Sequence, residues 1–224
     1  MTEELSNWGA EARQAFKESR DPKRLATAVV TFHKRVDQVL EASMQGHGVK
    51  VACTRGCSYC CSLQVEVQPH ETFTLADWLR RNFSAPGLAA VIERLRANAE
   101  KTRAMGLDAR KRSNVACALL GDDGACTAYE ARPAQCRRFH STVLETCKAS
   151  YANPADDSIP SPVHPAVAHN ASVIITQAQQ AVREAGLDAE SVDMNLALLE
   201  ALENPKSWRR WRDGKKAFVT AIPR

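Results

Sequence analysis

The sequence predicts a mainly α-helical fold with irregular, cysteine-rich segments at its centre. Apolar residues recur at steps of three and four over most of the 224 residues, which is the period of an amphipathic helix. The exceptions are two stretches, 50–66 and 113–147, and these two stretches contain all eight cysteines. A chain of this length can bury a hydrophobic core without cross-links, so the helices do not depend on the cysteines for a core.

The first strong helix is expected to begin at Pro22. Asp21 can cap the helix and proline suits a first turn. The pattern ends at 45–48, Gln-Gly-His-Gly, which breaks helices. A shorter helix is expected at 11–18. The apolar face of the longer helix comprises Leu25, Val29, Phe32, Val36 and Val39.

Four more elements are expected in the middle and second half of the chain. Alternation over 63–68 indicates one short strand, and helical spacing returns at 70–82 and at 85–105, with Ser84 as the cap of the latter. A loop with four prolines spans 153–165.

Two helices are expected after this loop. The first contains Val167 and Ile174 and ends at Gly186; the second contains Val192, Leu196 and Leu199 and ends at Asn204-Pro205. We divide the chain into N-terminal helices (1–48), a cysteine-rich core (49–150) and C-terminal helices (151–224), all parts of one compact domain.

The composition argues against several classes of protein. The formal net charge of +4 does not call for a nucleic-acid partner. The N-terminus lacks the apolar segment of a secretory signal, and no run of 18 apolar residues suggests a membrane span. We therefore expect a soluble, cytoplasmic protein. In a reducing compartment, eight cysteines indicate metal or redox chemistry rather than disulfides.

The first cysteine segment, residues 53–61, reads Cys-Thr-Arg-Gly-Cys-Ser-Tyr-Cys-Cys. Cys57 and Cys60 have the C-x-x-C spacing at which a tight turn directs two sulfurs to one metal ion, and Gly56 can adopt the positive φ that such a turn needs. Cys60 and Cys61 are neighbours whose side chains are expected to point in different directions. One of them is therefore expected to serve a second ion, a bulkier cluster or the core.

The second cysteine segment contains Cys117, Cys126 and Cys136. Residues 122–124, Asp-Asp-Gly, form a strong turn signal that would bring Cys117 and Cys126 together at the base of a hairpin. Pro133 favours an extended approach to Cys136. A site built from both segments would cross-link the fold around a soft metal, for which zinc, copper(I) and iron–sulfur clusters are the candidates.

Four arginines lie beside the cysteines in the sequence. Four thiolates around a divalent ion leave a net negative charge, which guanidinium groups can offset through charge-assisted hydrogen bonds. The candidates are Arg55, Arg132, Arg137 and Arg138.

The ordered combination of these motifs resembles the CxxCxxCC family, also called the YkgJ family, of zinc- or iron-chelating domains. The resemblance covers roughly residues 50–140 and implies metal binding. The sequence departs from the pattern in the three residues between Cys53 and Cys57, and in Ser58, where glycine is common. The matching residues are Cys57-Ser-Tyr-Cys60-Cys61, Cys117, Gly124-Ala-Cys126, Tyr129-Glu-Ala-Arg132-Pro133 and Cys136-Arg137.

All eight cysteines are candidate metal ligands for zinc or iron, the latter including an iron–sulfur cluster. Cys53 and Cys61 complete the set or hold a second ion, and Cys147, outside the matched motif, either ligates or packs. The expected main ligands are Cys57, Cys60, Cys117, Cys126 and Cys136.

The expected function is metal binding in a structural or metal-handling role. The alternative is a metal-dependent enzyme: proteins that resemble this chain include flagellin lysine methylases and proteins labelled iron–sulfur oxidoreductases. No glycine-rich loop for a nucleotide or S-adenosylmethionine and no catalytic dyad is recognisable.

The remaining polar residues are assigned ordinary roles. We expect a polar surface role for His140, with metal ligation as the alternative, a solvated loop at 110–112, and docking of Trp208 and Trp211 onto the core rather than onto nucleic acid. The expected partners are a metal ion and, as an open possibility, a protein; neither a nucleic acid nor a membrane is expected.

Overall fold

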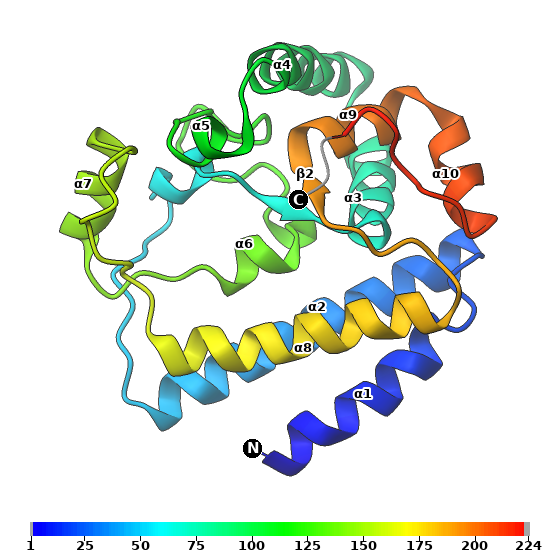
Figure 1. Cartoon of the computed structure of the whole chain (residues 1–224), viewed down its shortest axis with the longest axis horizontal. Coiled ribbons are helices and arrows are strands. Elements are labelled where there is room, and N and C mark those ends of the chain that lie inside the picture. Colours follow the sequence, from blue (N-terminus) through cyan, green and yellow to red (C-terminus); the bar gives the residue numbers. More distant parts are fainter. Residues whose placement is uncertain (1, 222–224) are drawn as a thin grey trace.

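The computed structural model describes residues 2–221 and confirms a mainly α-helical fold (Figure 1). Within that range the chain forms ten α-helices and one two-stranded sheet. The helices are α1 (Thr2–Phe16), α2 (Pro22–Gly46), α3 (Pro69–Asn82), α4 (Ala85–Arg103), α5 (Leu107–Lys111), α6 (Ala134–Arg138), α7 (Leu144–Ala152), α8 (Pro165–Glu184), α9 (Met194–Glu203) and α10 (Pro205–Arg212); the strands are β1 (Glu66–Val67) and β2 (Val192–Asp193).

Helices α1, α2 and α8 pack against one another along the lower side of the view in Figure 1. Helix α2 begins as predicted, because the Asp21 carboxylate accepts hydrogen bonds from the backbone N–H groups of Lys23 and Arg24. Helix α1 begins earlier than the predicted 11–18. Trp8, Ala12 and Phe16 are all buried at a four-residue step, so the buried face of α1 extends upstream of the expected segment to Trp8.

Helices α3, α4 and α9 form a second packed group, with α10 against α9. Ser84 caps α4 as predicted, since its hydroxyl oxygen accepts a hydrogen bond from Gly87 N–H. The predicted strand at 63–68 is reduced to the two residues of β1, which pair antiparallel with β2. Val192 belongs to β2 and not to the predicted helix, so that helix begins two residues later.

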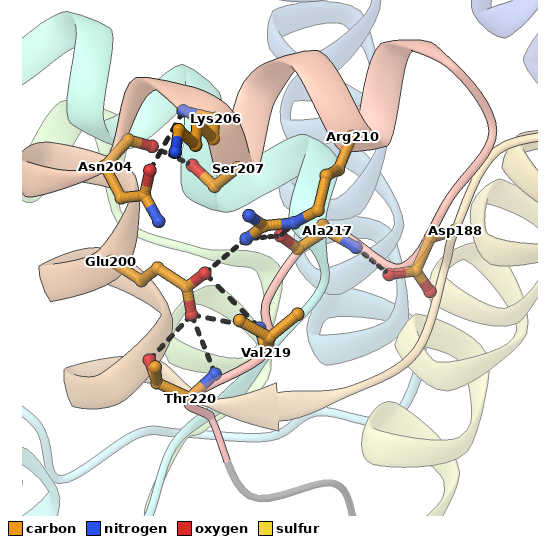
Figure 2. Close-up of polar contacts among 9 residues, drawn as sticks. All are labelled: Asp188, Glu200, Asn204, Lys206, Ser207, Arg210, Ala217, Val219 and Thr220. Atoms are coloured by element: carbon orange, nitrogen blue, oxygen red, sulfur yellow. Dashed lines mark hydrogen bonds and ion pairs between the residues drawn. The ribbon is translucent and has the colours of Figure 1, made fainter.

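The last described residues are fastened by a buried carboxylate, as Figure 2 shows. Glu200 of α9 is 5% exposed and accepts hydrogen bonds from Arg210, from the backbone N–H groups of Val219 and Thr220, and from the Thr220 hydroxyl. Trp211 of α10 is fully buried. The predicted docking of the tryptophan helix onto the core is therefore confirmed.

Two of the ordinary roles assigned to polar residues were wrong. Arg110 is 4% exposed and lies 3.6 Å from the carboxylate of Asp193 in β2, because it belongs to helix α5 and not to a solvated loop. His140 is 3% exposed rather than on the surface. No helix among residues 2–221 combines the length and the apolar character needed to cross a membrane.

Candidate metal centre

Two glycines let the cysteine segments approach each other. Gly56 (φ +85°) and Gly124 (φ +74°) both occupy the left-handed region that favours glycine. A Cβ atom on Gly124 would lie 2.7 Å from the Gly56 carbonyl oxygen, so the turn at 122–124 and the turn before Cys57 are in direct contact. The positive φ predicted for Gly56 is confirmed, and the two turns meet through backbone that has no room for a side chain.

Hydrogen bonds join the same two segments along their length. Cys117 N–H donates to the Cys61 carbonyl at 2.7 Å, and Val115 N–H donates to the Ser62 carbonyl at 3.1 Å. The predicted hairpin is present, with a bridge between Leu120 and Cys126 around the turn. Residues separated by more than 50 positions are thereby held side by side.

The thiols of Cys60, Cys117, Cys126 and Cys136 form what we call the inner thiol group. Their negative charges would repel one another, as expected of thiols gathered in one place. Burial raises the pKa of Cys117 to about 11, with further contributions from Cys126 and Cys60, and burial also raises the pKa of Cys136. Cys117 and Cys126 pack against the hydrophobic core.

Cys60 and Cys61 lie in the single 3₁₀ turn Tyr59–Ser62. Their thiols interact, and the hydrogen bond from Cys61 raises the pKa of Cys60. The expectation that these side chains diverge was wrong, because the two thiols lie within hydrogen-bonding reach of each other in this turn.

Three further cysteines, Cys53, Cys57 and Cys147, form what we call the outer thiol group, and Cys61, the neighbour of Cys60, is counted in neither group. Cys53 is exposed, and its sulfur accepts a hydrogen bond from Ser141 N–H at 3.3 Å. Burial raises the pKa of Cys53, and the charges of Cys57, Cys60 and Cys147 add to the rise. Cys147 lies on α7, which packs on the 3₁₀ turn from the left-hand edge of Figure 1. Cys60, a member of the inner group, therefore also lies near the outer group.

All eight cysteines are free thiols. Within residues 2–221, no three His, Cys, Asp or Glu side chains stand in an arrangement that could hold one metal ion. The structure thus places the thiols near one another, but their sulfur atoms do not point toward a common position. The donor set nevertheless fits a soft cation, because repulsion among partly buried thiolates is a cost that a bound cation removes.

Of the four predicted arginines, one faces the inner group. Arg132 lowers the pKa of Cys60 and Cys126, and its Nε and Nη1 atoms are buried without a hydrogen-bond partner among the described residues. Arg137 instead binds the Asp37 carboxylate at 2.6 Å and the Arg132 carbonyl at 2.9 Å. Unpaired N–H donors beside thiols are what the sulfurs of a metal centre would use.

The other two predicted arginines are used elsewhere, and a further arginine was missed. Arg138 contacts Gln135 and Ser172, and exposed Arg55 lies 3.7 Å from Asp123. Arg94 of α4 donates to the Ala118 carbonyl at 2.8 Å and lowers the pKa of Cys117. No local signal marks Arg94, because α4 meets the hairpin only in the folded chain.

A buried acid–base cluster behind Cys136 was also missed. Glu71 of α3 is 3% exposed, and its Oε1 atom is 2.8 Å from His33 Nε2 and accepts a hydrogen bond from Ala134 N–H at 2.7 Å. His70 is fully buried beside Phe16 and Phe32, and neither ring nitrogen has a hydrogen-bond partner among the described residues. Burial therefore lowers the pKa of His70 to about 4.

His140 is not available as a ligand in this arrangement. Its Nδ1 lies 3.1 Å from the Arg138 carbonyl, to which it donates, and its Nε2 accepts a hydrogen bond from His164 N–H at 3.0 Å. Both ring nitrogens are therefore engaged in holding backbone next to the cysteine segment.

A hollow of about 520 Å³ lies on the α2 side of the inner group and opens to solvent. Leu40 and Met44 supply apolar lining, and Arg132 and Arg137 form the edge nearest the cysteines. The lining also contains carboxylates, Asp37 and Glu41, so the hollow has no single charge character.

Comparison with known proteins identifies the segment that contains the thiols. The model of the CxxCxxCC family, described as a "putative zinc- or iron-chelating domain", matches residues 52–157. These residues include all eight cysteines. No curated protein and no solved structure matches the chain.

Proposed function

We propose that residues 52–157, the CxxCxxCC-family segment of the chain, bind zinc or iron through the inner thiol group. The observation that carries the proposal is the gathering of Cys117, Cys126 and Cys136 with Cys60 from a distant segment, around buried and unpaired nitrogens of Arg132. Cys53, Cys57 and Cys61 complete the set or hold a second ion.

The charges of the site support a soft cation. Buried thiols with raised pKa values are protonated near neutral pH, and a bound metal ion exchanges those protons for stronger sulfur–metal bonds. Four thiolates and one divalent ion carry a net charge of about −2, and the nearby guanidinium groups of Arg132 and Arg94 offset part of it.

Metal binding in this segment requires the thiols to turn toward one point. The segment 113–147 has short helices and turns rather than a hydrophobic core of its own, so a cross-link here would order it most. Structural zinc in small domains contributes on the order of 10–16 kcal/mol at neutral pH. A structural or metal-handling role follows from such a centre, and an open hollow of mixed charge does not by itself favour an enzyme.

The decisive experiment is elemental analysis of the natively purified chain and of single serine variants. Wild-type protein is expected to contain at least one zinc or iron per chain. C117S and C136S should each lose most of this metal, because three remaining thiolates bind far more weakly than four. Absorption at about 400 nm in anaerobically purified protein would indicate an iron–sulfur cluster. A colourless protein with stoichiometric zinc would indicate a zinc site.

The matched control is C147S, at an outer thiol on α7. This variant should keep most of the metal, since Cys147 interacts with the outer group and not with the thiols of 117–136. Wild-type protein without stoichiometric metal, or full metal content in both inner-group variants, would refute the proposal.

A further inference from the structure

Cys136 lies on a helix too short to fix its own position. Helix α6 has five residues, Ala134–Arg138, and its cap residue Pro133 provides no side-chain hydrogen bond. An isolated helix of this length is unstable in water, so its placement must come from tertiary contacts. It packs on α2 and α8.

One buried carboxylate holds the first residue of this helix. Oε1 of Glu71 accepts the Ala134 N–H at 2.7 Å and lies 2.8 Å from His33 Nε2. Glu71 is in the first turn of α3 and His33 is in the middle of α2. A single oxygen atom of α3 therefore joins α2 and α3 to the backbone two residues before Cys136.

The surroundings keep this carboxylate in one position. Glu71 and His33 are 3% and 6% exposed, so neither side chain can exchange its partner for water. Removing the carboxylate would leave the Ala134 N–H buried without an acceptor, which is costly, whereas leaving it in place satisfies the donor that begins α6.

We propose that Glu71 is the positioning residue of the inner thiol group, holding α6 so that the Cys136 thiol stays near those of Cys117 and Cys126. This inference rests on the proposed metal-binding function but concerns a geometry that exists without metal. Glu71 is not one of the proposed ligands. It acts through the backbone of Ala134, and His33 holds its carboxylate in place.

The test compares E71A with wild type in two forms of the protein. In the metal-free form, the alkylation rate of Cys136 by iodoacetamide is measured by peptide mass spectrometry, with Cys53 as the internal reference. Freeing α6 should raise the Cys136 rate about tenfold while leaving Cys53 unchanged, because opening a helix that has lost a buried hydrogen bond becomes easier by about that factor. In the metal-loaded form, a chelator should remove the metal about tenfold faster.

E200A is the matched control. Glu200 is also a buried carboxylate with several hydrogen bonds, but it fastens the C-terminal segment of Figure 2 instead of a cysteine helix. This variant is expected to lower the melting temperature without changing Cys136 alkylation or the rate of metal loss. A general loss of stability therefore cannot imitate the effect of E71A.

If E71A does not fold, the variant E71Q tests whether Glu71 positions Cys136. Glutamine keeps an oxygen acceptor for Ala134 N–H but is neutral and adds a buried N–H₂ group, so a roughly threefold rise in Cys136 alkylation is expected. Alkylation and metal loss equal to wild type in the folded Glu71 variants would overturn the inference. If wild-type protein holds no metal, the proposed function fails, and the alkylation arm still decides the role of Glu71.

Discussion

The inner and outer thiol groups contain the same kind of ligand but are supported differently. Cys117 and Cys126 of the inner group pack on the hydrophobic core, and Cys136 is placed by a helix that contacts α2 and α8. In the outer group, Cys53 is exposed on an irregular segment and Cys147 lies on α7, none of whose residues is fully buried. Support from the core, rather than the number of cysteines, distinguishes the two groups.

The two groups should therefore differ in their affinity for metal and in the reactivity of their thiols. Thiols held by packed elements lose little entropy when they bind an ion, and their raised pKa values make them slow nucleophiles without metal. The pKa of Cys53 is raised as well, but its thiol is exposed, so reagents reach it without any opening of the structure. Acid stability, thiol reactivity and the contact between the two turns each test how the inner group is supported.

Lowering the pH should reduce the free energy of unfolding through the titration of His70, which is buried beside Glu71. Its pKa is about 4 in the folded protein against 6.5 for an ordinary histidine, because burial opposes the charged form; Glu71 acts in the opposite direction, and His33 adds to the lowering. The unfolded chain therefore gains a proton first as pH falls. Between pH 6.5 and 4, this difference should cost about 3 kcal/mol of unfolding free energy.

The variant H70L isolates the contribution of His70 to this pH dependence, because leucine cannot titrate. Urea unfolding of metal-free protein at about pH 7.5 and about pH 4.5 should show a loss in wild type that exceeds the loss in H70L by about 2–3 kcal/mol. Parallel losses in the two proteins would mean that His70 is hydrated in solution.

Thiol reactivity should separate the two groups directly. A pKa of about 11 for Cys117, against an ordinary 9.0, leaves about 100-fold less reactive thiolate near pH 8. In metal-free wild type, Cys117 should therefore be alkylated at least about tenfold more slowly than exposed Cys53. Equal rates, measured by quantitative peptide mass spectrometry, would contradict the difference in burial between the groups.

The contact between the two turns should be the next most sensitive point. In G124A, the new Cβ would meet the Gly56 carbonyl at 2.7 Å, and alanine would be forced into a positive φ. We expect a loss of about 1–3 kcal/mol in unfolding free energy, together with faster metal loss.

G106A is the control for this variant. Gly106 has an ordinary φ of −67° and no atom within 4 Å of an added Cβ, so its replacement should change stability by less than about 0.5 kcal/mol. Chemical denaturation of both variants provides the comparison. An equal, small effect of the two substitutions would show that the turns separate easily.

The helices were predictable because their signals are local. Asp21 and Ser84 cap the helices that follow them, and Gly186 adopts the positive φ that ends α8, as their sequence contexts indicated. The predicted start of α1 was too late, because Trp8 already belongs to its buried face. The cysteines were recognisable as candidate ligands by type and spacing.

The support of the site could not be predicted, since it depends on contacts between distant segments. Glu71 resembles any acidic residue in a first helical turn until α6 is placed against it. Arg110 and His140 were assigned to the surface because both are polar, yet Asp193 and the His164 N–H give them buried partners. A polar residue reveals its burial only through the partner that compensates for it.

The contact of Gly124 with Gly56 also limits how the length of the chain can vary. A polar hairpin tip such as 122–124 is ordinarily where proteins accept inserted residues, tags or new termini. Here the tip rests against another turn, so even one added residue would push the two cysteine segments apart. Insertions and circular permutation should therefore succeed at the proline-rich stretch 153–163 and fail at this exposed tip.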